Sequence, residues 1–91
     1  MYRVKLTATA SEMFTRLHPD IKKQIRAILR KLYEAPYLGK ALQGELVHLR
    51  SLKMKRYRAI YQVNNENQTI IVYAIGHRRD IYEIVSGIFY G

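Results

Sequence analysis

Residues 46–75, LVHLRSLKMKRYRAIYQVNNENQTIIVYAI, decide the fold class. They contain three segments typical of β-strands, namely Leu46 to Lys53, Tyr57 to Val63 and Thr69 to Ile75. Met54-Lys55-Arg56 is a gap of hairpin length, and the polar cluster Asn64-Asn65-Glu66-Asn67 is typical of a turn. The last segment, TIIVYAI, is β-branched, aromatic and continuously apolar. Such a run predicts a strand at the centre of a sheet, covered on both faces over part of its length.

The residues before this stretch predict a strand followed by two helices. Tyr2 to Leu6 alternates apolar and basic residues, as a short strand does. Thr9-Ala10-Ser11-Glu12 has the pattern of a capping box, so a first helix is expected to begin there. His18-Pro19 should end that helix and begin a second one, because proline is tolerated in the first helical turn. Apolar residues at spacings of three and four extend the second helix to about Ala35.

The remaining segments complete a prediction of one domain over residues 1–91. Tyr37 to Gly44 is interpreted as a loop, and Gly76 as the end of the last strand. Arg79 to Ser86 is expected to form a short helix that stops at Gly87. We therefore predict an α+β fold of order β-α-α-β-β-β. A mostly antiparallel sheet would carry a helical hairpin packed on one face, followed by the short C-terminal helix.

Composition excludes several classes of protein. Sixteen Lys and Arg against seven Asp and Glu give a net charge of +9, which favours an anionic partner: nucleic acid, an acidic protein or a membrane surface. Without cysteine the chain has no disulfide framework, zinc knuckle or thiol nucleophile. Its apolar runs are far shorter than the roughly twenty residues that cross a bilayer, and MYRVKLTATA has no apolar core for a secretory signal. We expect a soluble, cytoplasmic protein without a membrane partner.

A cluster of basic residues lies in the strand half, with no acid among them: Arg50, Lys53, Lys55, Arg56 and Arg58. A hairpin that turns near residue 66 would bring Arg78 to the same end as Arg58, with Tyr82 just past the strand. Two arginines could then bind one anionic group, since the guanidinium stays protonated and donates in a fork. The alternative is a solvated basic edge that discourages association between sheets. The second helix carries a similar basic stripe: Lys22, Lys23, Arg26 and Arg30. These residues either form a solvated face or contact ribosomal RNA or an acidic partner.

No conventional acid–base pair accompanies these arginines. His18, His48 and His77 are too scattered to suggest a metal site, so neither a metal nor another cofactor is expected. His77, between Gly76 and Arg78, is a candidate for contact with substrate. The remaining chemistry is metal-free phosphoryl transfer on RNA, in which a 2′-hydroxyl attacks its own phosphate and fixed positive charge stabilises the transition state. A tyrosine could orient or deprotonate that hydroxyl if cations lowered its pKa.

Three segments in combination resemble the RelE/ParE superfamily of toxins from type II toxin–antitoxin systems: LQG (42–44), LRSLKMKRYRAIYQV (49–63) and IGHRRDIYE (75–83). The resemblance covers residues 2 to 83, and the order of elements agrees. It implies a RelE-like mRNA endoribonuclease, or mRNA interferase, that inhibits translation by cutting mRNA in the ribosomal A site. A ParE-like inhibitor of DNA gyrase and an inactive interaction or co-repressor module are the alternatives.

The resemblance also implies roles for individual residues. Arg58 would hold phosphate, Arg78 would stabilise or protonate the leaving group, and Tyr82 would orient or activate the 2′-hydroxyl. The candidate RNA-binding residues are Arg50, Lys53, Lys55, Arg56 and His77. Two lysines that contribute to catalysis in RelE toxins would fall on Leu49 and Ser51.

The implied partner of such a toxin is an acidic antitoxin that covers the basic cleft. The two chains would form a hetero-oligomer that could bind operator DNA through the antitoxin. The apolar segment from Ile84 to Tyr90 is expected either to pack beneath the sheet or to join that contact.

Overall fold

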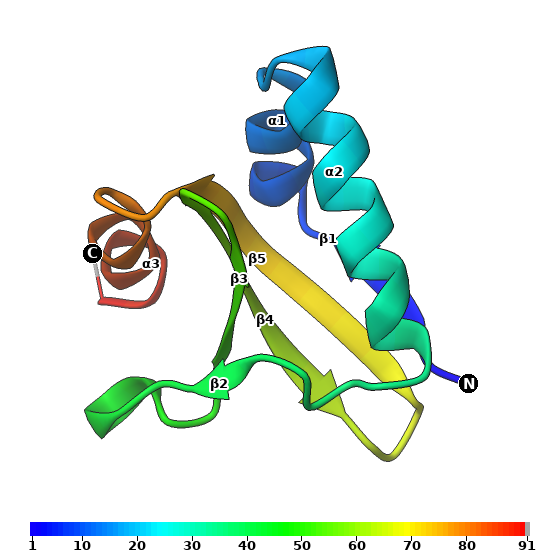
Figure 1. Cartoon of the computed structure of the whole chain (residues 1–91). Coiled ribbons are helices and arrows are strands. Elements are labelled where there is room, and N and C mark those ends of the chain that lie inside the picture. Colours follow the sequence, from blue (N-terminus) through cyan, green and yellow to red (C-terminus); the bar gives the residue numbers. More distant parts are fainter. Residues whose placement is uncertain (91) are drawn as a thin grey trace.

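A five-stranded sheet of order β1-β5-β4-β3-β2 organises residues 1–90, the part of the chain that the computed structural model describes (Figure 1). β1 runs parallel to β5, with Arg3 opposite Thr69, and the other neighbouring pairs are antiparallel. The strands are β1 (Arg3–Leu6), β2 (Lys40–Ala41), β3 (Arg50–Met54), β4 (Tyr57–Asn64) and β5 (Thr69–His77). The predicted α+β class with a mostly antiparallel sheet is confirmed.

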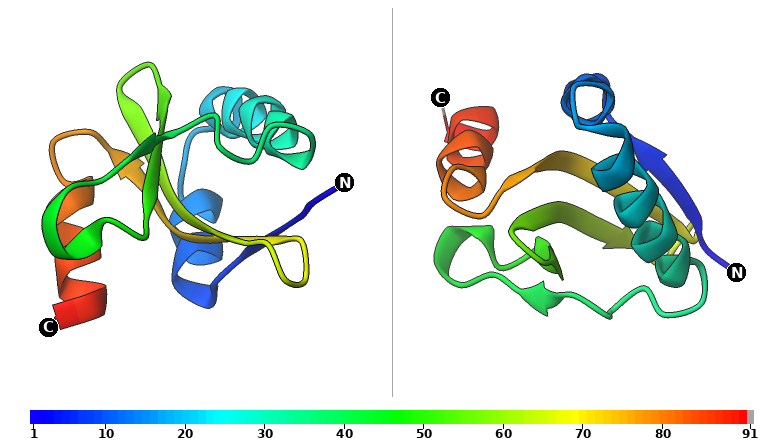
Figure 2. Two further views of the ribbon diagram at one scale, coloured as in Figure 1. Left: turned by 90° about the horizontal axis from the view of Figure 1, so that it is seen from below. Right: turned by 45° about the horizontal axis from the view of Figure 1, so that its top comes forward.

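Helices cover both faces of this sheet (Figures 1 and 2). α1 (Ala8–Thr15) and α2 (Pro19–Arg30) pack on one face as the predicted helical pair, and α3 (Ile81–Tyr90) packs on the other. The core under α1 and α2 includes Ile25, Leu29, Leu52, Tyr61 and Val72. The core under α3 consists of Leu49, Ile60, Ala74, Ile81 and Val85. The apolar C-terminal segment therefore packs against the sheet, which was one of its two expected positions.

β5 is covered on both faces, as its apolar run predicts, and it contains a bulge. Ile60 lies opposite Ala74 while Tyr61 lies opposite Val72, so Tyr73 is an extra residue on β5. Tyr73 and Ala74 consequently both belong to the core under α3. The strand does not end at Gly76, because His77 still pairs with Tyr57.

The helix boundaries differ from the prediction at three places. Thr7 caps α1, not the capping box predicted at Thr9. The Thr7 Oγ1 accepts the N–H of Ala10 at 3.1 Å, and the Thr7 N–H donates to the carbonyl oxygen of Val72. α2 ends at Arg30 and continues as a 3₁₀ turn over Lys31–Tyr33. α3 runs through Gly87, where burial of its apolar side outweighs the cost of about 1 kcal/mol for a helical glycine. His18 joins α1 to α2 as predicted, and its Nδ1 accepts the N–H of Asp20 at 3.1 Å.

The predicted loop over residues 37–44 contains the short strand β2, and the strand predicted from Leu46 begins only at Arg50. A 3₁₀ turn, Gly44–Leu46, separates the two strands, and His48 packs against Phe89 at 5.7 Å between ring centroids. A two-residue strand carries too little alternation to be recognised in sequence; here its pairing with β3 defines it. No helix within residues 1–90 is long and apolar enough to cross a membrane.

Candidate functional site

A cavity of about 320 Å³ lies on the α3 side of the sheet, where β2, β3 and β4 meet the first turn of α3. Its lining residues are Lys40, Ala41, Leu42, Ser51, Lys53, Arg58 and Tyr82. We call it the α3-side cavity. It brings together two of the three predicted catalytic residues, Arg58 and Tyr82, with the predicted RNA-binding residue Lys53.

Strand pairing places these side chains on one face. Lys40 lies opposite Ser51, and Lys53 lies opposite Arg58. Along β3, Leu52 and Met54 point into the core under α1 and α2, so the alternate positions Ser51 and Lys53 point the other way. Tyr82 follows Ile81, which is fully buried and anchors the start of α3 on the sheet.

Hydrogen bonds orient two of the lining side chains. The hydroxyl oxygens of the buried Ser51 and of Tyr82 are 3.2 Å apart. Arg58 Nη1 donates to the carbonyl oxygens of Lys55 at 3.1 Å and of Tyr57 at 3.0 Å. Its Nε and Nη2 make no hydrogen bond within residues 1–90, so they can donate to a ligand.

The α3-side cavity is strongly cationic. Lys40, Lys53 and Arg58 line it, and no carboxylate does. Within residues 1–90 the only salt bridge of a lysine or arginine joins Arg16 to Glu12, which leaves the three cations without an acidic partner. Neighbouring positive charges repel one another, so an anion in the cavity would relieve that repulsion.

Arg78 and His77 lie near this site without lining it. The N–H of Arg78 donates to the carbonyl of Arg56 at 2.7 Å, which places Arg78 at the predicted end of the β4–β5 hairpin. The chain turns after His77, however, and the exposed Arg78 side chain does not line the α3-side cavity. His77 stacks edge-to-face on Tyr57 at 5.8 Å, and its Nδ1 accepts the N–H of Arg79. Arg58 and Arg78 therefore share one end of the hairpin, as predicted, but they do not line the same cavity.

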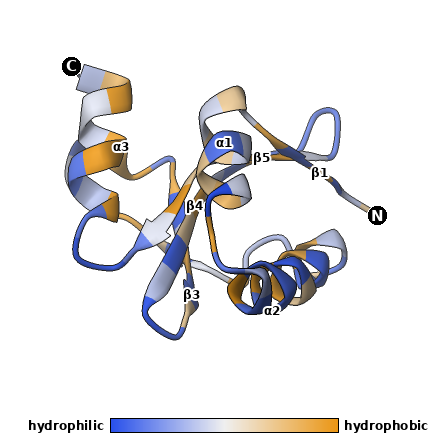
Figure 3. Ribbon diagram, turned by 90° about the horizontal axis from the view of Figure 1, so that it is seen from above, coloured by the Kyte–Doolittle hydropathy of each residue, from blue (hydrophilic) through white to orange (hydrophobic). Residues whose placement is uncertain are grey.

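Arg50, Lys55 and Arg56 lie elsewhere. Arg50 Nε donates to the carbonyl of Gly39 at 2.9 Å, and its guanidinium lies over the Tyr37 ring, so this arginine holds the loop before β2. Lys55 and Arg56 form the exposed β3–β4 turn and border a small apolar hollow against α2. Figure 3 shows this turn and the segment that leads into α3 in the colours of hydrophilic residues.

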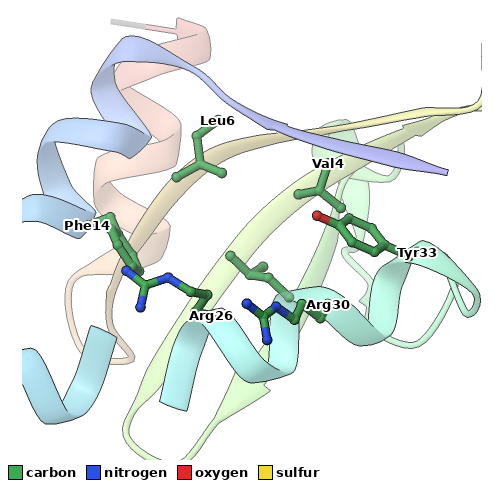
Figure 4. A pocket seen from close by; sticks show the side chains of 7 residues that line it. Val4, Leu6, Phe14, Arg26, Arg30 and Tyr33 are labelled. Carbon is green, nitrogen blue, oxygen red and sulfur yellow. The ribbon is translucent and has the colours of Figure 1, made fainter. Parts of the chain in front are cut away.

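A second hollow, of about 290 Å³, lies between β1 and α2 (Figure 4). Val4, Leu6 and Phe14 line it together with the arginines of α2 that were predicted as a basic stripe. The Arg26 guanidinium lies over the Phe14 ring at 5.4 Å, so part of the stripe packs on the protein. None of the predicted catalytic residues lines this hollow.

Sequence reasoning missed Lys40 and Ser51 as site residues. Lys40 was in a predicted loop, and only its pairing with Ser51 shows that it shares the cavity. Ser51 was noted only as a position that lacks a lysine. Within residues 1–90 no three His, Asp or Glu side chains gather as a metal site would require.

A family described as ParE toxin of type II toxin–antitoxin system, parDE, matches residues 4–82. The chain belongs to the RelE/ParE superfamily of these toxins, as the sequence resemblance predicts.

Individual relatives agree with this assignment. Toxin RelG of Mycobacterium tuberculosis is 30% identical over 86 residues, which is 89% of this chain and 95% of RelG. A putative RelE-like toxin protein of Escherichia coli is 28% identical, over 93% of this chain and 94% of its own length. The toxin–antitoxin complex RelBE2 of M. tuberculosis contains a similar structure, with a TM-score of 0.79, 29% identity and coverage of 85% of this chain and 98% of that one. The isolated E. coli RelE toxin has the same fold, with a TM-score of 0.77, 24% identity and coverage of 97% and 99%.

Proposed function

We propose that this toxin is a ribosome-dependent mRNA endoribonuclease of the RelE type that works without a metal. The observation that carries the proposal is the α3-side cavity, which joins Arg58 and Tyr82 with two lysines and no carboxylate. A cationic cavity with a phenol at its wall suits a phosphodiester whose negative charge grows in the transition state. The similarity to Toxin RelG and to a putative RelE-like toxin supports this choice within the family.

In the proposed reaction, the 2′-hydroxyl of one nucleotide attacks the adjacent phosphorus. The new bond from the 2′-oxygen to phosphorus closes a 2′,3′-cyclic phosphate, and the bond from phosphorus to the 5′-oxygen breaks. Arg58 would neutralise the non-bridging oxygens with Nε and Nη2. Tyr82 would orient the 2′-hydroxyl or, as the phenolate, take its proton. Arg78, at the same end of the hairpin, would approach the departing 5′-oxygen and either stabilise its charge or donate the proton that the oxygen gains.

The proposed partner is an acidic antitoxin. The M. tuberculosis relative was solved as a toxin–antitoxin complex, and the net charge of +9 suits an acidic protein that covers the cationic cavity. The complex would be a hetero-oligomer that binds operator DNA through the antitoxin.

One observation favours a second candidate, a ParE-like inhibitor of DNA gyrase. Leu49 and Ser51, which stand where the RelE resemblance places lysines, are both buried, and Leu49 is part of the core under α3. The site thus lacks the two lysines that contribute to catalysis in RelE toxins, and this absence favours a toxin that binds gyrase without cutting RNA.

Mapping of mRNA 5′ ends in a bacterial translation extract tests the proposal. Wild type, Arg78→Ala and Arg79→Ala are compared with and without ribosomes; Arg79 is the matched control because it is the adjacent exposed arginine. We expect cuts that require ribosomes, disappear with Arg78→Ala and persist with Arg79→Ala. Intact mRNA from folded protein that still arrests growth would refute the ribonuclease, and cleaved DNA–gyrase complexes would then support the second candidate.

A further inference from the structure

Hydrogen bonds of the neighbouring residue and pairing with β3 position the backbone of Lys40 in the edge strand β2. The preceding residue, Gly39, donates its N–H to Tyr61 Oη at 2.8 Å, and its carbonyl accepts from Arg50 Nε at 2.9 Å. Tyr61 is completely buried in the core under α1 and α2. The pairing of Lys40 with Ser51 then fixes the lysine beside the α3-side cavity.

The Lys40 side chain lies outside both core clusters. It is exposed, it has no carboxylate partner within residues 1–90, and it lines the cavity with two other cations. A lysine on an edge strand can discourage association between sheets, but that role does not require a position in a cavity beside two further cations. Its position suits an anion that all three cations contact.

We propose that Lys40 is a substrate-binding residue that contacts a phosphate of the RNA strand together with Lys53 and Arg58. This inference rests on the proposed function for the identity of the ligand and deepens it. The edge strand β2 thereby becomes part of the site, and the hydrogen bonds of Gly39 position the backbone from which the Lys40 side chain extends.

Fluorescence anisotropy tests the role of Lys40 without ribosomes or cleavage. The probe is a six-nucleotide, fully 2′-O-methylated RNA with a 5′ fluorescein, titrated with toxin from 20 to 200 mM NaCl. The variants are Lys40→Gln, Lys40→Arg and Lys5→Gln. Lys5 is the matched control because it is an exposed lysine on β1, the opposite edge strand, so both glutamine variants lose one charge.

We expect Lys40→Gln to weaken binding about fivefold at low salt and to reduce the slope of log K against log salt by about 0.7, the value for one phosphate contact on a single strand. Lys40→Arg should restore both quantities, and Lys5→Gln should change affinity by less than about twofold. Equal effects of the two glutamine variants, or no binding by wild type at 20 mM NaCl, would overturn the inference.

Failure of this inference can be distinguished from failure of the proposed function. If Lys40→Gln binds RNA as tightly as wild type while wild type cuts mRNA on ribosomes, the ribonuclease stands and the role of Lys40 does not. If RNA binding depends on Lys40 but no ribosome-dependent cut is found, the phosphate contact stands and the ribonuclease does not.

Discussion

Replacing Tyr61 with Phe should destabilise the fold far more than the loss of one oxygen atom suggests. The Tyr61 hydroxyl donates to the carbonyl of Pro36 at 2.8 Å and accepts the N–H of Gly39 at 2.8 Å. Phe keeps the ring in the core but leaves both backbone groups without a partner. The Gly39 N–H is buried, and an unpaired buried group costs about 1–3 kcal/mol, while the Pro36 carbonyl is part-buried and costs less. We expect the free energy of unfolding to fall by about 2 kcal/mol, which for a chain of this size lowers Tm by about 8–16 °C.

Urea denaturation and calorimetry measure this loss, with Tyr73→Phe as the matched control. The Tyr73 hydroxyl donates to Gln62 Oε1 at 3.0 Å in a part-buried position, so its removal should cost less than about 1 kcal/mol. Equal losses in the two variants, or a loss below about 0.5 kcal/mol for Tyr61→Phe, would refute the reasoning.

The difference in stability between wild type and Tyr61→Phe should depend on pH. Burial raises the pKa of Tyr61 above its ordinary value, although the Gly39 hydrogen bond and the Arg50 charge lower it in part. The unfolded chain ionises this phenol near pH 10, so the contribution of Tyr61 is complete below that pH and declines as pH rises toward the folded pKa. Wild type should therefore lose stability more steeply than Tyr61→Phe as pH rises above about 10. Parallel stability curves in urea titrations at these pH values would contradict the assignment.

Four further substitutions test contacts at the site and in the fold. Ser51→Ala should slow mRNA cleavage about tenfold but add nothing to Tyr82→Phe, since both act through one hydrogen bond; additive losses in a double-mutant cycle of cleavage rates would contradict this. Ile81→Ala should lower the free energy of unfolding in urea by about 2–4 kcal/mol, and an unchanged value would contradict the anchoring of α3. Gly39→Ala should destabilise the fold by about 1–3 kcal/mol, because the new Cβ lies 2.8 Å from the Ser51 carbonyl oxygen. Gly87→Ala should stabilise the fold by about 0.5–1 kcal/mol, because the space around its Cβ is open. A higher Tm for Gly39→Ala than for Gly87→Ala would contradict the described surroundings of the two glycines.

The sequence predicts the sheet strands well wherever the signal is local. The apolar run 69–75 indicates a central strand, because both faces of β5 are covered. His18-Pro19 marks the joint between α1 and α2, because a helix cap and a proline in the first turn are local requirements. The helix start at Thr7 was missed, since it depends on the hydrogen bond from its N–H to Val72, far along the chain.

The candidate site was predicted only in part, because its geometry depends on strand pairing. Arg58 and Tyr82 share a cavity as expected, but Lys40 joins them through a two-residue strand with no pattern of its own. The position of Arg78 outside the cavity follows from the turn after His77, which residue types alone do not determine. The biochemical roles of these residues stay predictions.

The pairing of β1 with β5 affects how the protein is made. β1, Arg3–Leu6, precedes the other four strands in the chain, and its only partner within residues 1–90 is β5, which begins at Thr69. Contacts so distant along the chain form late, so a growing polypeptide cannot complete the sheet before β5 has been translated. Tyr82 follows later still, on α3. Products of premature termination that stop before Thr69 therefore lack β5 and Tyr82, and with them both the completed sheet and one wall of the α3-side cavity.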